Sequence, residues 1–312
     1  MNRANMHKKL FSAAILLMLI LTLVSIQPAS SQTPLQTILI RPDGTIYPST
    51  AAIQRSGNIY TFTDNIYAAL KIQKSDIVLD GAGHTLWGPY NGEESDLWFI
   101  GSENGQQYNS TQKYIIGVDL GNSSVEGVVI ENLNIKNFSI GMYMWTKNNT
   151  VVKNAVSENV IGILLSGSNS TVIENYIANN QRGLFFGFNN PGDIIPSDIH
   201  ISQNSFKNNI IQLNGCECKN YNTTESPHNW DNGKEGNYWS DYNGTDTNGD
   251  GVGNTPYTID ALNQDRYPLM ESTVQPPVPT GQISTELVVF FAALIAIVGF
   301  VFLGLKRVKK RI

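Results

Sequence analysis

The residues with the clearest chemistry lie in a short acidic loop, Asp246–Asn254. Four side chains carry oxygen atoms at its positions one, three, five and nine: Asp246, Asn248, Asp250 and Asn254. With Gly251 at position six for the turn, this spacing is typical of calcium-binding loops. Position twelve is Tyr257 instead of a bidentate glutamate, so the match is partial. The loop is a candidate structural calcium site, and an ordinary Asp/Asn/Gly turn is the alternative.

Aromatic residues are concentrated around this loop: Trp230, Tyr238, Trp239, Tyr242, Tyr257 and Tyr267. Sugar rings pack on aromatic faces while their hydroxyls bond to nearby amides and carboxylates. Trp230, Trp239 and Tyr242 are therefore candidate carbohydrate-binding residues. The favoured alternative is a cap, because the open end of a repeat fold must be covered.

Two thiols and an imidazole form a weaker candidate metal site. Cys216 and Cys218 stand one residue apart, and His228 follows ten residues later. This spacing departs from zinc-binding patterns, and a disulfide across one residue is strained. Plain thiols or a local disulfide are favoured over a bound metal.

The acidic residues do not predict a catalytic pair. Glycoside hydrolysis needs two carboxylates at a defined separation. Lys153 and Glu174 are better interpreted as a solvated ion pair, and Asp80 precedes a glycine, as a turn residue does. Asp193 and Asp198 are the best of a weak set. With four histidines and no Ser-His-Asp grouping or phosphate loop, no catalytic residue is assigned.

The elements that position these groups follow from an internal repeat of 21 residues. Five columns recur at this interval: Ile130/Val151/Val172, Ile135/Val156/Ile177, Gly141/Gly162/Gly183, Met142/Ile163/Leu184 and Met144/Leu165/Phe186. The interval then lengthens to 29, from Ile177 to Phe206, which predicts an inserted loop around residues 191–196. Segments at 77–83 and 117–120 look like earlier coils, giving about five or six.

Short segments of alternating polarity separated by Gly and Asn predict strands, and units this small must stack to bury a core. Between Asn122 and Asn214 the chain has 18 asparagines. Two columns of them, 154/175/204 and 159/180/209, are expected at the corners, where Asn accepts a left-handed backbone and stacked amides bond in a ladder. Because Leu133 and Phe138 occupy these positions one repeat earlier, the ladder should begin one coil later.

One further column, Tyr143, Leu164 and Phe185, alternates with the inward residues and must face outward. An exposed apolar stripe needs a partner. The loop from Pro89 to Lys113 is long enough to cover it, and a binding groove is the alternative.

Residues 37–215 resemble the right-handed β-helix repeats of the family that includes NosD-type periplasmic copper-accessory proteins and many carbohydrate-binding or sugar-hydrolysing proteins. Residues 228–270 are similar to the C-terminal segment of anchored members on prokaryotic, chiefly archaeal, surfaces, through Asn229–Asp231, Gly236–Tyr242 and Tyr267–Met270. The resemblance specifies a fold better than a chemistry. It also implies copper, but Met142 and Met144 belong to the apolar columns, and only Cys216, Cys218 and His228 remain as soft ligands, too few to favour copper.

The chain ends predict secretion and anchoring. Residues 1–31 have a basic start, an apolar run and small residues at the two positions that a signal peptidase reads, as a signal peptide cut after Ser31 does; an uncleaved anchor is the alternative. Residues 287–305 are uncharged and long enough for one transmembrane helix. The basic tail 306–312 should lie in the cytoplasm and the body outside the cell. Pro-rich residues 273–286 predict an extended stalk.

The net charge of the chain limits the classes of partner that it can bind. Residues 32–286 contain 13 basic and 26 acidic side chains, so a nucleic acid would be repelled. We therefore expect an all-β chain: a right-handed parallel β-helix (32–215), an aromatic and acidic cap (216–272), the stalk and one membrane helix. The preferred function is a surface module that binds carbohydrate or has a structural role, and a polysaccharide hydrolase or lyase and a copper-accessory protein are the alternatives.

Overall fold

The computed structural model describes residues 35–90, 115–121, 124–187, 196–215 and 226–278. All of its strands belong to one compact unit that begins at Gln36. The predicted signal peptide, transmembrane helix and basic tail, and residues 279–286 of the predicted stalk, lie outside the described residues, as do Cys216 and Cys218. Within the described ranges, no helix is long and apolar enough to cross a membrane.

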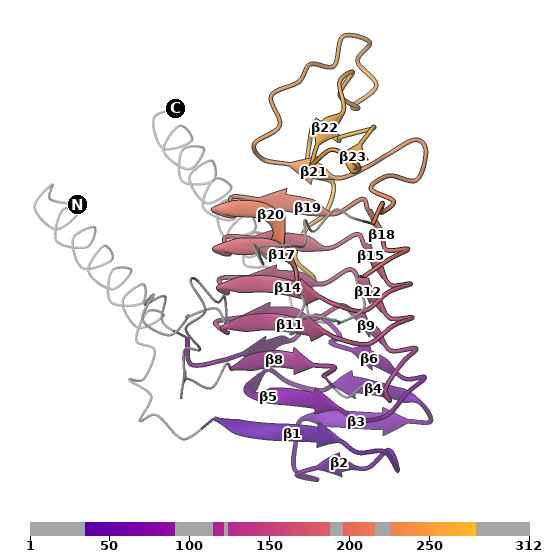
Figure 1. Ribbon diagram of the computed structural model, residues 1–312. Helices are drawn as coiled ribbons and strands as arrows, with labels where there is room; N and C mark the ends of the chain where they lie inside the picture. Colours follow the sequence, from indigo (N-terminus) through magenta and orange to yellow (C-terminus); the bar gives the residue numbers. More distant parts are fainter. Residues whose placement is uncertain (1–34, 91–114, 122–123, 188–195, 216–225, 279–312) are drawn as a thin grey trace, which may run out of the picture. The chain divides into compact units, whose positions relative to one another are not determined.

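The chain winds into stacked coils of short parallel strands (Figure 1). Each full coil has one strand on each of three faces, which we call A, B and C. Face A contains β1 (Gln36–Ile40), β5 (Ile66–Ile72), β8 (Ile116–Asp119), β11 (Ile140–Met144), β14 (Ile161–Leu165), β17 (Arg182–Phe186) and β20 (Ile211–Gly215).

Face B contains β3 (Ile53–Ser56), β4 (Ile59–Phe62), β6 (Val78–Asp80), β9 (Val129–Glu131), β12 (Thr150–Val152), β15 (Thr171–Ile173) and β18 (His200–Ser202). Face C contains β7 (Thr85–Trp87), β10 (Asn134–Lys136), β13 (Ala155–Ser157), β16 (Tyr176–Ala178), β19 (Ser205–Lys207) and β21 (Tyr238–Trp239). Three strand pairs of the described residues are antiparallel. On face B, β3 pairs with β4; outside the three faces, β2 (Ile46–Tyr47) pairs with β1, and β22 (Tyr257–Thr258) pairs with β23 (Gln264–Asp265).

The strand register confirms the repeat predicted from the sequence. Val151 pairs with Ile130 on one side and Val172 on the other. Ile177 pairs with Phe206, so the stack keeps its register across the longer interval of 29 residues. The coils β6–β8, β9–β11, β12–β14, β15–β17 and β18–β20 are complete, and β4–β5 form a partial one before them. The prediction of five or six coils is therefore confirmed.

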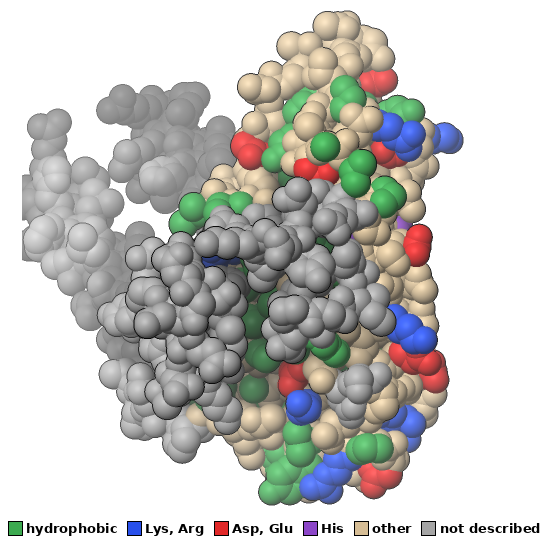
Figure 2. All heavy atoms as spheres, viewed as in Figure 1, with side chains coloured by type: hydrophobic (Ala, Val, Ile, Leu, Met, Phe, Trp, Pro, Cys, Tyr) green, Lys and Arg blue, Asp and Glu red, His purple; other side chains and the backbone are tan. Residues whose placement is uncertain are grey.

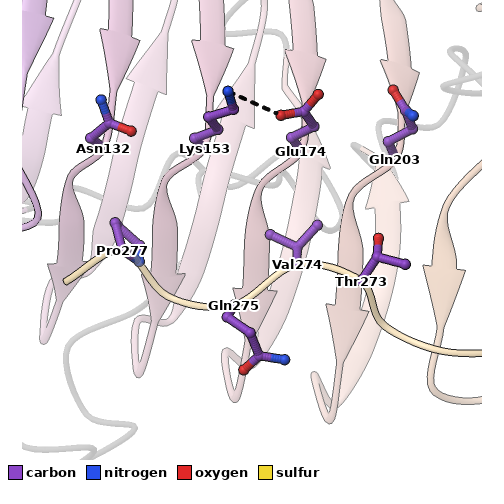
Figure 3. A pocket seen from close by; sticks show the side chains of 8 residues that line it. All are labelled: Asn132, Lys153, Glu174, Gln203, Thr273, Val274, Gln275 and Pro277. Carbon is purple, nitrogen blue, oxygen red and sulfur yellow. Dashed lines mark ion pairs between the residues drawn. The ribbon is translucent and has the colours of Figure 1, made fainter. Parts of the chain in front are cut away.

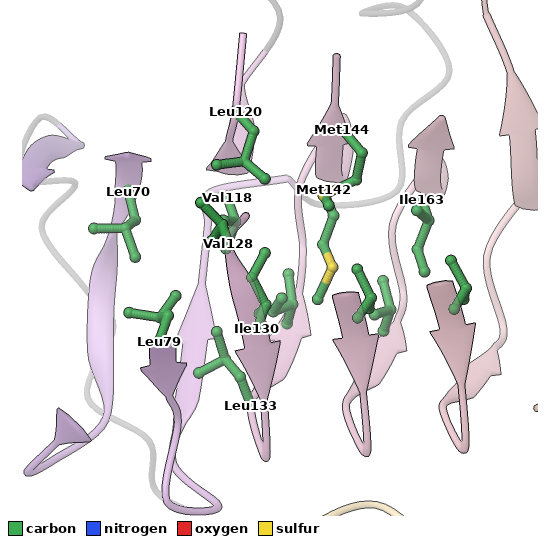
Figure 4. Packing of buried hydrophobic residues seen from close by; sticks show 14 of the residues in the cluster. Leu70, Leu79, Val118, Leu120, Val128, Ile130, Leu133, Met142, Met144 and Ile163 are labelled. Atoms are coloured by element: carbon green, nitrogen blue, oxygen red, sulfur yellow. The ribbon is translucent and has the colours of Figure 1, made fainter. Parts of the chain in front are cut away.

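The predicted columns fill the interior. Residues such as Leu79, Ile130, Met142 and Ile163 are fully buried and point into the coil (Figure 4). The glycine column marks a close approach between coils, because a Cβ on Gly162 would lie 2.5 Å from the carbonyl oxygen of Gly183. Here a side chain would push neighbouring strands apart.

The outward column predicted on face A also exists. Phe185, with Ile140 and Ile161, forms a separate apolar cluster outside the core, and Tyr143 and Leu164 pack against it. Phe185 is only 6% exposed. The segment predicted to cover this stripe lies almost entirely outside the described residues, so the choice between a covered stripe and a groove stays a prediction.

The asparagine ladders differ from the prediction in one respect. The left-handed backbone belongs to the residue before the inward corner position, which a ladder asparagine occupies in the later coils and Leu133 or Phe138 in the first. These left-handed residues are Asn132, Lys153, Glu174 and Gln203 at the B/C corner, and Asn137, Glu158, Asn179 and Asn208 at the C/A corner. A two-residue corner explains this, since its first residue turns the chain and projects outward while its second points inward. The ladder asparagines are therefore buried hydrogen-bonding groups and not the turn formers.

Candidate functional site

A groove runs along the B/C corner of the coils. Each corner places one outward side chain on the surface, and successive coils stack these into the column Asn132, Lys153, Glu174 and Gln203. Residues 273–277 form the opposite wall (Figure 3). The groove encloses about 450 Å³. It is the outward projection of the left-handed residues that builds this wall.

The groove mixes polar with apolar groups and is nearly neutral. Asn132 and Gln203 contribute amides, Thr273 contributes a hydroxyl, and Val274 and Pro277 contribute apolar groups. Its two charges form an ion pair, with Lys153 Nζ 3.6 Å from Glu174 Oε2. The side chains of this pair are 62% and 40% exposed, so the pair adds little to stability. This confirms the predicted solvated pair, and the groove can offer donors and acceptors to a neutral ligand.

Beside the groove the structure shows a pair of carboxylates that the sequence analysis missed. Asp80 and Glu131 are in register on neighbouring strands β6 and β9. Burial and the negative charge of Asp80 raise the pKa of Glu131, while Lys153 opposes the shift. Asp80 Oδ1 accepts hydrogen bonds from the Ala82 backbone N–H (2.8 Å) and from Asn132 Nδ2 (3.2 Å).

A carboxyl group with a raised pKa beside a second carboxyl group is an arrangement that suits acid–base chemistry. The 21-residue interval does not relate these two acids, because Asp80 and Glu131 are 51 residues apart. The intervening segment hides the register. Aligning Ile77–Gly81 with residues 128–132 directly would have found it.

The predicted sugar-binding tryptophans lie inside the cap. Trp239 is 1% exposed, and its ring stacks on Phe206 at 4.4 Å and on Tyr257 at 4.3 Å. Trp230 is 2% exposed and donates its indole N–H to Asn263. The third candidate, Tyr242, is partly buried and donates its hydroxyl to the Thr255 carbonyl. This burial favours the cap interpretation over the sugar platform.

The cap also contains a buried carboxylate without a sequence signal. Asp265 Oδ2 accepts hydrogen bonds from the Asn237 backbone N–H (2.6 Å) and Trp239 Nε1 (2.9 Å), and Oδ1 accepts one from the Tyr267 N–H. Burial raises the pKa of Asp265 to about 6 despite these donors. Gly236 is needed here, because a Cβ at this position would overlap the carboxylate.

The acidic loop brings its predicted ligands together. Asn248 Nδ2 donates to Asp250 Oδ2 (2.8 Å), and Asn254 Nδ2 lies 3.5 Å from Asn248 Oδ1. Asp246 accepts backbone N–H groups from Gly249 and Gly251, which lowers its pKa. These bonds also suit an ordinary turn, so calcium binding at this loop stays a prediction.

A soft-metal site is not formed by the part of the chain that the structure describes, where no three His, Cys, Asp or Glu side chains gather. His228 stacks on Phe186 at 4.9 Å, and its Nδ1 is buried without a hydrogen-bond partner. Burial lowers the pKa of His228 to about 4, while Asp260 and Asp198 oppose the shift.

Charged side chains of both signs are interspersed on the face shown in Figure 2.

In comparisons with known proteins, residues 54–244 match the model of one family, described as periplasmic copper-binding protein (NosD). No curated protein and no solved structure matches the chain.

Proposed function

Because the chain belongs to the NosD family of parallel β-helix proteins, we propose that it is a cell-surface module that binds a neutral polysaccharide in the B/C corner groove. One observation carries this proposal: the groove repeats a polar side chain at each coil. Strands of neighbouring coils lie about 4.8 Å apart, so the groove presents evenly spaced groups to an extended polymer.

The chemistry of the groove supports a sugar. Amide and hydroxyl side chains both donate and accept hydrogen bonds, as sugar hydroxyls do. The ion pair of Lys153 and Glu174 leaves no net charge there for an ionic ligand. The surplus of acidic residues in 32–286 disfavours an acidic polymer.

Binding to glycans tests this proposal. The full chain should bind one or more neutral polysaccharides on an array without shortening them. The double variant Asn132→Gly, Gln203→Gly keeps the left-handed corners and should lose at least about tenfold in affinity, the loss of roughly 1.4 kcal/mol. The control is Glu158→Gly, at a left-handed corner on the other side of face C. Equal affinity of both variants would place the site elsewhere.

A polysaccharide hydrolase is the second candidate, and the in-register pair of Asp80 and Glu131 favours it. In this mechanism the carboxyl group of Glu131 protonates the leaving oxygen while the Asp80 carboxylate bonds to the anomeric carbon; a water that Glu131 deprotonates then displaces Asp80 and releases the sugar. Release of reducing ends from a bound polymer, lost in Glu131→Gln, would replace simple binding with hydrolysis.

The family description also raises copper, but the described residues do not fit it. His228 supplies one buried nitrogen, and no cluster of soft ligands accompanies it among them. Stoichiometric Cu(I) uptake that disappears in the Cys216→Ser, Cys218→Ser variant would establish copper handling.

We propose calcium as a stabilising ion for the loop Asp246–Asn254 and one membrane helix at residues 287–305 as the anchor. Calorimetric titration with calcium should give heat that Asp246→Ala, Asp250→Ala removes. Fractionation should recover the full chain with membranes and a chain ending at residue 286 in the soluble fraction.

A further inference from the structure

Residues 271–278, which we call the strap, lie along the side of the coils. The Pro-rich composition predicts an extended stalk, and the strap runs back across face C. Ser272 Oγ donates to Ser205 Oγ at 2.8 Å, and the Pro277 carbonyl accepts a hydrogen bond from Asn134 Nδ2 at 2.9 Å. The strap therefore reaches from β19 back to β10.

The strap is extended between these two contacts. Its end points belong to one outward column in which Asn134, Ala155, Tyr176 and Ser205 pair in register. Three strand spacings make about 14 Å. Five residues from Ser272 to Pro277 span about 16 Å in polyproline II geometry. An extended segment fits this path with little slack.

The strap is held weakly. It crosses the strands, as Figure 3 shows, so its backbone does not join a β-ladder. Pro276 and Pro277 also lack the N–H group that a ladder needs. Within the described ranges, two hydrogen bonds link residues 271–278 to the coils: the one to Ser205 and the one from Asn134. Most strap residues are exposed, and a segment with two hydrogen bonds to the coils opens at low free-energy cost.

A row of small and polar side chains lies along the path of the strap on face C, and we call this row the channel. Ala155 and Ser205 point outward from face C but are 4% and 0% exposed. Tyr176 and Tyr238 stand on either side of Ser205 in the same column. Small residues leave room for a chain, and the tyrosine rings and the Asn134 amide are groups that sugars bind.

We infer that this channel is the inner part of the polysaccharide cleft and that the strap occupies it as an internal competitor. The inference rests on the proposed function of the corner groove. A crossing peptide would leave its backbone groups without ladder partners, whereas sugar hydroxyls bond to the hydroxyl and amide side chains present. If the docked state of the strap is about ten times more populated than the released state, the apparent affinity for the polysaccharide falls about tenfold.

A reversible lock tests the inference on the full chain. Ser205→Cys, Ser272→Cys in a Cys216→Ser, Cys218→Ser background should form a disulfide, since the two hydroxyl oxygens are in contact. Binding to β-glucan, mannan and galactan is measured before and after reduction. We expect the oxidised protein to bind at least about tenfold more weakly than the reduced one, and Ser272→Cys alone to show no redox effect.

Hydrogen exchange provides a second readout. In the unlocked protein, a bound polysaccharide should speed exchange of the strap amides, and in the locked protein it should not. If oxidised and reduced proteins bind equally and exchange in the strap is unchanged, the inference fails while binding in the corner groove stands. If no form binds any polysaccharide, including Ser272→Ala, the proposed function and the inference both fail. If a synthetic peptide of residues 270–280 displaces the strap and no polysaccharide does, the channel binds a protein chain and the inference fails.

Discussion

The interior asparagine ladder differs between the coils and the cap. Within the coils, Asn175 accepts a hydrogen bond from the Asn154 backbone N–H and donates its own amide to the Val151 and Ile173 carbonyls. The ladder continues through Asn204 and Asn237 and ends at Asp265, which accepts from the Asn237 N–H. Asp265 accepts and does not donate. A ladder residue between two others must both donate and accept hydrogen bonds, whereas the residue at the end of the ladder needs only to accept them.

The first prediction exchanges the two kinds of rung. Asn175→Asp places a carboxylate against the carbonyl oxygens of Val151 and Ile173 and the side-chain oxygen of Asn204. Buried repulsion and lost donors should lower the free energy of unfolding by about 4 kcal/mol. Asp265→Asn keeps an acceptor and should cost only about 1 kcal/mol. Urea unfolding followed by circular dichroism compares them, and equal costs would contradict the distinction.

The second prediction concerns pH, because the cap contains two buried groups with opposite linkage. The pKa of Asp265 is raised from 3.8 to about 6, so its contribution to stability is full below pH 3.8 and is lost as pH rises through 6. The pKa of His228 is lowered from 6.5 to about 4, so its contribution is full above pH 6.5 and is lost as pH falls through 4. Each shift corresponds to about 3 kcal/mol.

These two contributions should nearly cancel between pH 4 and 6 in the unmodified protein. His228→Phe, which keeps the stack on Phe186, should show stability falling by about 3 kcal/mol as pH rises from 4 to 6. Asp265→Asn should show stability rising over the same interval. Thermal or urea unfolding across this range measures both, and parallel profiles for the two variants would contradict the assignment.

The smallest prediction concerns the corner turns. Lys153 has φ of 57°, a conformation that Asn adopts at lower cost. Lys153→Asn should therefore raise the free energy of unfolding by about 0.5 kcal/mol, even though it removes the exposed pair with Glu174. Lys147→Asn is the matched control, since it removes an exposed pair with Glu126 where φ is not positive. An equal effect of both changes would remove the conformational explanation.

The same contrast separates what the sequence predicts from what it does not. The apolar columns were predicted residue by residue because 21-residue spacing places Val151 beside Val172 in any stacked coil. The role of Asn154 was predicted one position off, since periodicity locates a corner but not which of its two residues has positive φ. Asp265 has no counterpart at the repeat interval, so nothing in the pattern marks it as the last rung.

The candidate site was harder to predict than the fold. Its corner column recurs at the repeat interval but combines four different residue types, so no shared side-chain chemistry marks the column in the sequence. The strap joins residues 143 apart in sequence, Asn134 and Pro277, through a single hydrogen bond. Composition indicated an extended segment there but contained no information on what it would lie against.

The lengthened step between β17 and β18 has a practical consequence. Phe206 still pairs with Ile177 although eight more residues separate them than in the neighbouring coils. Because the register is kept across the longer interval and added loop length costs little free energy, this position suits the grafting of a foreign epitope and gives evolution a place to diversify recognition while the interior stays constant.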